Sequence, residues 1–188
     1  MASMLSLFSR MFGRSQSRPG GTTVARGNGE AAAWVIGLLD IRPTDRILEI
    51  GFGRGVGIQL LAERASAGRI SGIDALPEML GQATARNREA ISSGRVRLEL
   101  GSADRLPFAD ASFETVLAID AMHHWPDRVA ALREMRRVLK VAGRIAVAFS
   151  ADAGQSKSGQ AETLTAAGFM APELVEKGGT FCWLATKP

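Results

Sequence analysis

The stretch EIGFGRGVG at residues 49–57 decides the fold that the rest of the chain adopts. A short hydrophobic run at residues 46–51 predicts a buried strand, and the apolar periodicity of residues 56–65 predicts a helix after the glycines. Glycine adopts positive φ readily and lets backbone approach a ligand closely. The start of a helix adds free N–H groups and about half a positive charge. The stretch therefore indicates a strand, a tight loop and a helix that together hold an anionic group.

The spacing of the glycines narrows the choice of ligand. A dinucleotide-binding G-x-G-x-x-G loop would need glycine where this chain has Val56 or Ile58, and the Gly-Lys-Ser or Gly-Lys-Thr end of a P-loop does not occur. What remains is G-x-G-x-G, with Glu49 just upstream and Asp74 at the end of the next predicted strand. An acidic residue in that place suits hydrogen bonds to both hydroxyls of a ribose, so the ligand is expected to contain a nucleoside.

Outward from this loop, short β-type runs alternate with longer helical patterns. Strands are predicted at residues 46–51, 69–74, 96–100, 113–120, 144–149, 173–176 and 180–185. Helices are predicted at residues 56–65, 77–92, 126–139 and 161–167, with Pro77 and Pro126 as first helical residues. Residues 151–160, rich in Ser, Gly and Ala, predict a flexible loop. The alternation predicts an α/β fold, with a mostly parallel seven-stranded sheet that carries helices on both faces.

The charge of the chain divides it into two parts. The 188 residues carry a net charge of +4, but residues 1–29 hold four arginines and no acid, so residues 30–188 balance at 19 basic against 19 acidic side chains. We expect a basic, flexible N-terminal segment at 1–29 and one domain at 30–188. Nucleic acid is an unlikely partner by this criterion, because the body lacks the positive field that phosphate binding uses.

Composition excludes several kinds of site. Cys182 is the only cysteine and His123 and His124 are the only histidines, so disulfides and a dedicated His/Cys zinc site are not expected, and the metal assignment is none. Tyrosine is absent, which rules out a phenol as base or nucleophile. The sequence shows neither a membrane-spanning run nor a secretory signal, and a cytoplasmic location is expected.

The N-terminal segment itself allows several interpretations. Wound as a helix, residues 4–12 gather their apolar side chains on one arc and place serines and Arg10 opposite. Such a segment is either a frayed tail, a flap over the active site, a membrane-surface helix that gives peripheral contact through residues 1–20, or an organelle transit peptide. The sequence leaves these alternatives open.

Five motifs in order resemble one known family. They lie at residues 48–55, 72–80, 101–108, 109–113 and 123–139. Together they resemble the class I S-adenosylmethionine-dependent methyltransferases, specifically the methyltransferase type 11 group that includes the ubiquinone and menaquinone biosynthesis C-methyltransferases. The resemblance covers residues 30–150 well and the last strands loosely. It implies a Rossmann-like methyltransferase fold and S-adenosyl-L-methionine as cofactor.

The resemblance also assigns cofactor contacts. The matching positions are Glu49, Gly51, Phe52, Gly53, Gly55, Asp74, Ala75, Met79, Ser102, Ala103, Asp104 and Asp120. It implies that the glycine loop wraps the methionine part and that Asp74 holds the ribose. Glu49 either orders the loop or meets the amino group, Met79 either packs on the adenosine or belongs to the core, and Asp120 either faces the amino group or caps its strand.

Two positions depart from the family pattern. Many relatives have an acidic residue where this chain has Ser102, so the adenine contacts fall to the Ser102 hydroxyl and the Ala103 N–H, with Asp104 either supplying the carboxylate or lying in solvent. Residues 140–143 read Lys-Val-Ala-Gly where relatives often have Lys-Pro-Gly-Gly, which is expected to alter only a turn.

The catalytic candidates are His123 and His124, which follow the fourth predicted strand. A methyl group on a sulfonium is already activated, so a base is needed only where the acceptor loses a proton. Histidine suits that task near neutral pH, and adjacent side chains on an irregular segment point in different directions, so at most one is expected to serve. Each is otherwise a packing residue. Arg54 either binds an acidic acceptor or lies in solvent, and Trp125 is either core or an acceptor platform.

The sequence therefore predicts transfer of a methyl group to a small-molecule or lipid-type acceptor by in-line displacement. Residues 120–123 do not form the Asn/Asp-Pro-Pro-aromatic motif that many methyltransferases of nucleic-acid amino groups use. Two alternatives stay open: a weak or inactive cofactor-binding partner module, and an RNA-directed methyltransferase that uses the basic tail. The acceptor atom and the oligomeric state are not specified.

Overall fold

The computed structural model of the protein describes the backbone of residues 21–188 and the side chains from Gly29 onward. The segment at 4–12, with its alternative roles, lies outside the described residues. Seven strands form one sheet in the order β3-β2-β1-β4-β5-β7-β6. Their bounds are Arg46–Ile50 (β1), Arg69–Asp74 (β2), Val96–Leu100 (β3), Phe113–Ile119 (β4), Leu139–Phe149 (β5), Met170–Lys177 (β6) and Thr180–Thr186 (β7). Strands β1 to β5 pair in parallel and β7 runs antiparallel to both its neighbours, which confirms the predicted α/β class.

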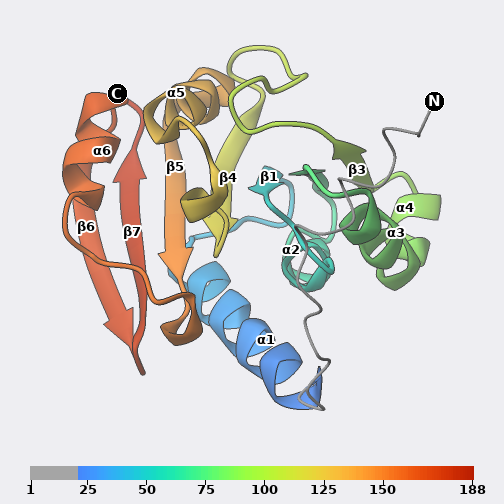
Figure 1. Ribbon diagram of the computed structural model, residues 1–188. Helices are drawn as coiled ribbons and strands as arrows, with labels where there is room; N and C mark the ends of the chain where they lie inside the picture. The colour runs from blue at the N-terminus through green and yellow to red at the C-terminus, as the bar shows by residue number, and fades with distance from the viewer. Residues whose placement is uncertain (1–20) are drawn as a thin grey trace, which may run out of the picture.

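Helices cover both faces of the sheet (Figure 1). One face packs against helices α1 to α4, which span Gly21–Leu38, Val56–Arg64, Pro77–Arg86 and Arg88–Ser92. The other packs against α5 (Arg128–Val138) and α6 (Gln160–Ala166). Two 3-10 turns, Met122–His124 and Ala151–Ala153, follow β4 and β5. The second of these turns lies within the loop predicted at residues 151–160.

Because helices cover both faces, the central strands are apolar on both sides. In β1, Ile47 belongs to the cluster under α1 and α2, while Leu48 and Ile50 belong to the cluster under α5. Glu49 alternates with its neighbours and falls on the same face as Ile47, beneath the start of α2, with 4% of its surface exposed. The pleat of a buried strand thus places one carboxylate inside the protein.

Two predicted helix bounds are wrong. The helix expected to run from Pro77 to about residue 92 breaks at Asn87, whose buried side chain donates to the carbonyl oxygens of Gly55 at 3.0 Å and Ala83 at 2.9 Å. Pro126 does not open the next helix. Asp127 caps that helix by accepting a hydrogen bond from the Ala130 N–H at 2.9 Å, as capping residues do.

Strand β5 begins earlier than predicted, directly after α5 at Leu139. Ala142 adopts a φ of 60°, and a Cβ on Gly143 would lie 2.7 Å from the Lys140 carbonyl oxygen, so the departure at residues 140–143 forms a tight turn within the strand. Helix α1 runs across residue 30, where the domain was predicted to begin.

The strand order sets the position of any ligand site. From β1 the chain continues outward to β2 and β3, whereas β4 lies on the other side of β1 and leads to β5. A crevice forms at the carboxyl ends of the strands where the order reverses, and open α/β sheets bind ligands there. The glycine loop leaves β1 at this point, and the histidine turn leaves β4 beside it.

A single guanidinium holds the segment between β3 and β4 on α5. Arg137 donates to the carbonyl oxygens of Leu106 and Phe108 at 3.0 and 2.8 Å and to the Asp110 carboxylate at 2.8 Å. It also forms an ion pair with Glu134, which itself accepts from the Leu106 N–H at 2.9 Å.

We expect Arg137→Met to lower the free energy of unfolding by about 1–3 kcal/mol, because two backbone carbonyls and two carboxylates lose a charged donor. Chemical denaturation measures the change. Arg133→Met on the exposed side of the same helix is the matched control and should change stability by less than about 0.5 kcal/mol. Equal effects of the two substitutions would contradict this role.

Candidate functional site

The glycine loop has a backbone that side chains would not tolerate. Gly51, Gly53 and Gly55 have φ values of 76°, 49° and 76°. A Cβ on Gly51 would overlap that of Ala121, and one on Gly55 would lie 2.6 Å from the Asn87 amide nitrogen. Positive φ and close packing together explain why these positions hold glycine.

Asp74 connects the end of β2 to this loop. Its Oδ2 accepts a hydrogen bond from the Gly53 N–H at 2.8 Å, and its Oδ1 accepts one from the Leu76 N–H at 3.0 Å. The residue is 7% exposed and lines the larger of the two cavities described below. Each carboxylate oxygen has a second lone pair, so Asp74 can brace the loop and still accept hydrogen bonds from a ligand.

Glu49 lies buried beneath the loop. Its Oε2 has no hydrogen-bond partner among the described residues. The carboxylate fits because position 57 is glycine: a Cβ on Gly57 would overlap it. Burial raises the pKa of the Glu49 carboxyl from 4.5 to about 8, and the negative charge of Asp74 adds to the increase. A buried, unpartnered acid costs stability, and a cationic ligand group would recover that cost.

Two adjoining cavities flank the glycine loop at the carboxyl ends of β1, β2 and β4. The smaller, of about 460 Å³, is lined by Ala32, Glu49, Gly51, Phe52, Gly53, Arg54, Val56, Gly57, Met79, Arg86, Ile119 and Asp120. The larger, of about 620 Å³, is lined by Ile50, Gly51, Gly53, Ile73, Asp74, Ala75, Leu76, Met79, Gly101, Ser102, Ala103, Asp120, Ala121, His124, Trp125 and Pro126. Both volumes are typical of small-molecule sites.

Most predicted contact residues line these cavities, and three do not. Gly55 packs against Ala83 of α3 instead. Asp104 is exposed within a turn that a Ser102–Arg105 bridge closes, and it lines neither cavity. His123 also lines neither cavity.

Arg86 was not predicted and lines the smaller cavity. Its Nε donates to the Arg54 carbonyl oxygen at 3.0 Å. The chain brings it to the site because α3 ends beside the glycine loop, and an arginine on an exposed helix gives no sequence signal of this position.

The two histidines face different surroundings. His124 is exposed and lines the larger cavity beside Trp125. The His123 ring lies 3.9 Å from that of His124 and 6.2 Å from that of Phe149, between centroids, and its buried Nδ1 has no partner among the described residues. Partial burial lowers the pKa of His123 below 6.5, the charge of His124 adds to this, and Asp120 opposes it.

Asp120 lies between the two cavities in an unusual backbone conformation. Its φ is 52°, a strained value for a residue other than glycine, and strain of this kind gathers at functional sites. Its Oδ1 accepts a hydrogen bond from the Ser150 N–H at 2.7 Å, which ties the end of β4 to the end of β5. It therefore ends its strand and also lines both cavities, and its contact with the amino group of the cofactor stays a prediction.

This constellation matches a known domain. The family model described as "Methyltransferase domain" matches residues 48–147, which is more than half of the chain and contains the glycine loop, Asp74 and the histidine turn. The chain belongs to the methyltransferase-domain family. S-adenosyl-L-methionine is the cofactor of this class of domain, as the sequence predicted.

Two curated relatives share about a third of their aligned residues with this domain. The 27-O-demethylrifamycin SV methyltransferase of Amycolatopsis mediterranei is 37% identical over 111 residues, which are 59% of this chain and 40% of that protein. The ubiquinone/menaquinone biosynthesis C-methyltransferase UbiE of Geobacter sp. is 32% identical over 103 residues, 54% of this chain and 44% of the relative. The aligned part of this methyltransferase domain thus spans less than half of either relative.

A solved structure supports the fold. A SAM-dependent methyltransferase from Aquifex aeolicus superposes with a TM-score of 0.77 at 17% identity, over 92% of this chain and all of that one. At this identity the likeness concerns the Rossmann-like fold alone. Among the described helices of this methyltransferase domain, none has the length and apolar character needed to cross a bilayer.

The stability of the domain should depend on pH through Glu49. Above pH 4.5 the unfolded chain ionises this carboxyl, while the folded protein keeps the proton until about pH 8. Folded stability therefore falls as pH rises through that interval, and Glu49→Gln removes the loss. Between pH 5 and pH 9, we expect the free energy of unfolding of the variant to rise relative to that of wild type by at least about 1.4 kcal/mol, the equivalent of one pKa unit.

Thermal unfolding across this pH range measures the difference. Glu63→Gln, an exposed change on α2, is the control and should show no such trend. If the difference in unfolding temperature between Glu49→Gln and wild type stays constant from pH 5 to pH 9, the buried carboxyl is ionised throughout this range and the expectation is wrong.

Proposed function

We propose that the protein is an S-adenosylmethionine-dependent methyltransferase that acts on a small-molecule acceptor. The observation that carries the proposal is the unpartnered Glu49 Oε2, buried at the cavity beside a glycine loop that Asp74 holds in place. The cavities bring together the Asp74 carboxylate for a ribose, the Glu49 carboxyl group, which an approaching ammonium group would ionise, and the backbone of the glycine loop. The single domain at 30–188 and the cytoplasmic location stay predictions.

Each part of the cofactor finds matching chemistry in the cavities. Asp74 accepts hydrogen bonds from the ribose, and the apolar walls of the larger cavity, with Met79 and Leu76, receive the adenine. Glu49 meets the ammonium group of the methionine part, and the guanidinium groups of Arg54 and Arg86 supply positive charge for its carboxylate. Glu49 was expected either to order the loop or to meet the amino group. Asp74, and not Glu49, accepts the hydrogen bond that the Gly53 N–H donates, so we assign Glu49 to the amino group.

The names of the relatives support the acceptor class. One relative is named as the methyltransferase of 27-O-demethylrifamycin SV and another as a C-methyltransferase of ubiquinone and menaquinone biosynthesis, and both names point to small-molecule acceptors. The larger cavity opens beside His124 and Trp125, which leaves room for an acceptor next to the cofactor.

The chemistry divides between the cofactor and the chain. When bound, S-adenosyl-L-methionine would supply a methyl group on a positively charged sulfur: the acceptor would bond to the methyl carbon and the sulfur would leave as the neutral thioether of S-adenosylhomocysteine. The chain's own residues hold the acceptor in line, exclude water and accept a proton where one is lost. We assign the proton-accepting role to His124, because it faces the larger cavity and His123 does not.

Calorimetric titration with S-adenosylmethionine and S-adenosylhomocysteine tests the cofactor site. We expect micromolar binding by wild type and at least tenfold weaker binding by Asp74→Ala, a loss of about 1.4 kcal/mol or more. The substitution removes the ribose acceptor and the hydrogen bond to the Gly53 N–H.

Asp104→Ala is the matched control, because Asp104 also lies near the end of a strand but lines neither cavity. The cofactor affinity of this variant should stay within twofold of that of wild type. Absence of binding by wild type would refute the proposal. Cofactor binding without methyl transfer to any acceptor in a broad screen would favour the inactive partner module, and salt-sensitive RNA binding would favour the RNA-directed enzyme.

The histidine assignment predicts unequal effects of two substitutions. On an O–H or N–H acceptor found in the screen, His124→Ala should lower kcat about a hundredfold or more, with cofactor affinity within twofold of wild type. His123→Phe, which keeps a ring against Phe149, should lower kcat less than fivefold. Rates of labelled methyl transfer measure both, and a larger loss in His123→Phe would reverse the assignment.

A further inference from the structure

The two cavities beside the glycine loop share part of their wall. Four residues line both of them, namely Gly51, Gly53, Met79 and Asp120, and only Asp120 has a charged side chain. Strand β4 pairs in parallel with β1, so its end lies beside the loop, and a Cβ on Gly51 would overlap that of Ala121. The chain therefore brings the Asp120 carboxylate to the wall that the two cavities share.

The Asp120 carboxylate keeps most of its accepting capacity free. Its Oδ1 accepts the hydrogen bond from the Ser150 N–H at 2.7 Å. No cationic side chain among residues 29–188 forms an ion pair with it. A carboxylate has two oxygens that can each accept more than one hydrogen bond, so one backbone donor does not saturate it. Asp120 can therefore attract a positive charge on a ligand.

Each of the other two acids lines one cavity alone. Glu49 lines the smaller cavity, where we assign it to the ammonium group, and Asp74 lines the larger one, where it accepts from the ribose. The sulfur of S-adenosylmethionine joins the ribose to the amino-acid part of the molecule. A cofactor held by these two acids therefore places its sulfur at the shared wall, which is where Asp120 lies.

We propose that Asp120 distinguishes the cofactor from its product by charge, because its carboxylate attracts the sulfonium of S-adenosylmethionine and not the neutral thioether of S-adenosylhomocysteine. The inference rests on the proposed function and adds a specificity-determining residue to it. The attraction exists while the sulfur is positive and is lost once the methyl group has moved to the acceptor. Asp120 thus favours retention of the substrate over retention of the product.

The structural roles of Asp120 do not explain its charge. Its φ of 52° is a value that asparagine and glycine also adopt, and an asparagine oxygen would accept the Ser150 N–H equally well. The neighbouring His123 does not supply a cation at neutral pH, because partial burial lowers its pKa below 6.5. A positive ligand group at the shared wall does explain why the residue is an acid.

Calorimetric titration of three ligands at pH 7 tests the proposal. The ligands are S-adenosylmethionine, S-adenosylhomocysteine and sinefungin, in which a carbon with a charged amino group replaces the sulfonium. Asp120→Asn removes the charge and keeps the size of the side chain and the acceptor for Ser150. We expect the variant to bind S-adenosylmethionine and sinefungin about fivefold more weakly or worse, and S-adenosylhomocysteine within about twofold of wild type.

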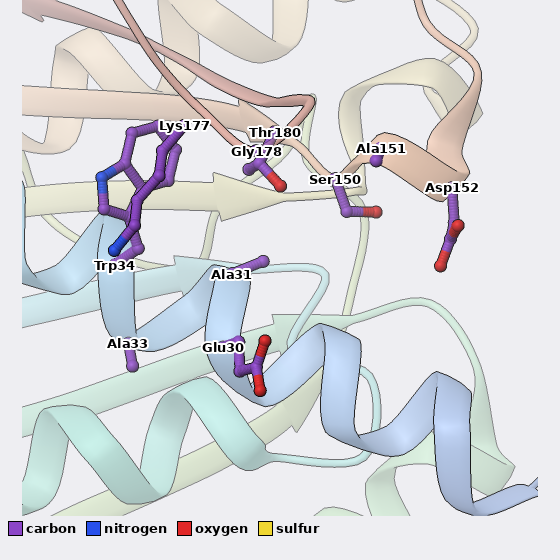
Figure 2. Close-up of a pocket in the computed structure, with 10 residues that line it drawn as sticks. All are labelled: Glu30, Ala31, Ala33, Trp34, Ser150, Ala151, Asp152, Lys177, Gly178 and Thr180. Atoms are coloured by element: carbon purple, nitrogen blue, oxygen red, sulfur yellow. The ribbon is translucent and has the colours of Figure 1, made fainter.

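Ser150→Ala is the matched control. The Ser150 side chain lines a separate cavity of about 610 Å³ between α1 and the turn that joins β6 to β7 (Figure 2), and only its backbone N–H bonds to Asp120. This variant should bind all three ligands as wild type does. Asp120→Gly is a second charge-free variant, and it should fold because glycine adopts positive φ without strain. It should show the same selective loss of S-adenosylmethionine, and thermal unfolding reports whether each variant is folded.

Equal weakening of S-adenosylmethionine and S-adenosylhomocysteine by the Asp120 substitutions would overturn the proposal. That result is expected of a contact with the amino group, which both ligands have. Unchanged binding of S-adenosylmethionine would overturn it as well. Absence of binding of all three ligands by wild type would instead refute the proposed function, and the inference with it, so the two failures give different patterns.

Discussion

The hydrogen bond between the Gly53 N–H and the Asp74 carboxylate joins the two parts of the molecule on which the site depends. A glycine-rich loop has many conformations, and each must be lost on folding. Asp74 stabilises one of these conformations by accepting a hydrogen bond from the Gly53 N–H. The Asn87 side chain stabilises the same conformation by donating to the Gly55 carbonyl oxygen. The ends of β1 and β2 are thereby fixed to each other and to α3, and the cavities form around that junction.

Much of this arrangement follows from local sequence. The strand of β1, the glycine loop and Asp74 are recognisable because buried strands, tight turns and strand-end acids have distinct residue types. The alternation of short β-type runs with helical patterns predicts the seven-stranded sheet, and the resemblance implies the Rossmann-like methyltransferase fold. Most assigned cofactor residues line the cavities, since they lie at the carboxyl ends of neighbouring strands.

The features that the sequence did not reveal depend on contacts between distant segments. Asn87 breaks α3 because its side chain meets a carbonyl 32 residues earlier, and helix periodicity contains no trace of that contact. Arg86 also reaches the site through a contact between distant segments, because its side chain donates to the Arg54 carbonyl oxygen. The sequence alone could not distinguish the roles of the adjacent residues His123 and His124. Only the backbone of the turn after β4 determines which ring faces the cavity.

Glu49 and Gly57 fill a single space from two elements, because a Cβ on residue 57 would overlap the carboxylate. Position 57 therefore cannot gain a side chain independently of position 49 during evolution. A lineage that gains a side chain at 57 must first shorten the residue at 49, and a lineage that keeps the acid must keep the glycine. The two positions should covary among related chains, although they lie eight residues apart and neither is explained by its own neighbours.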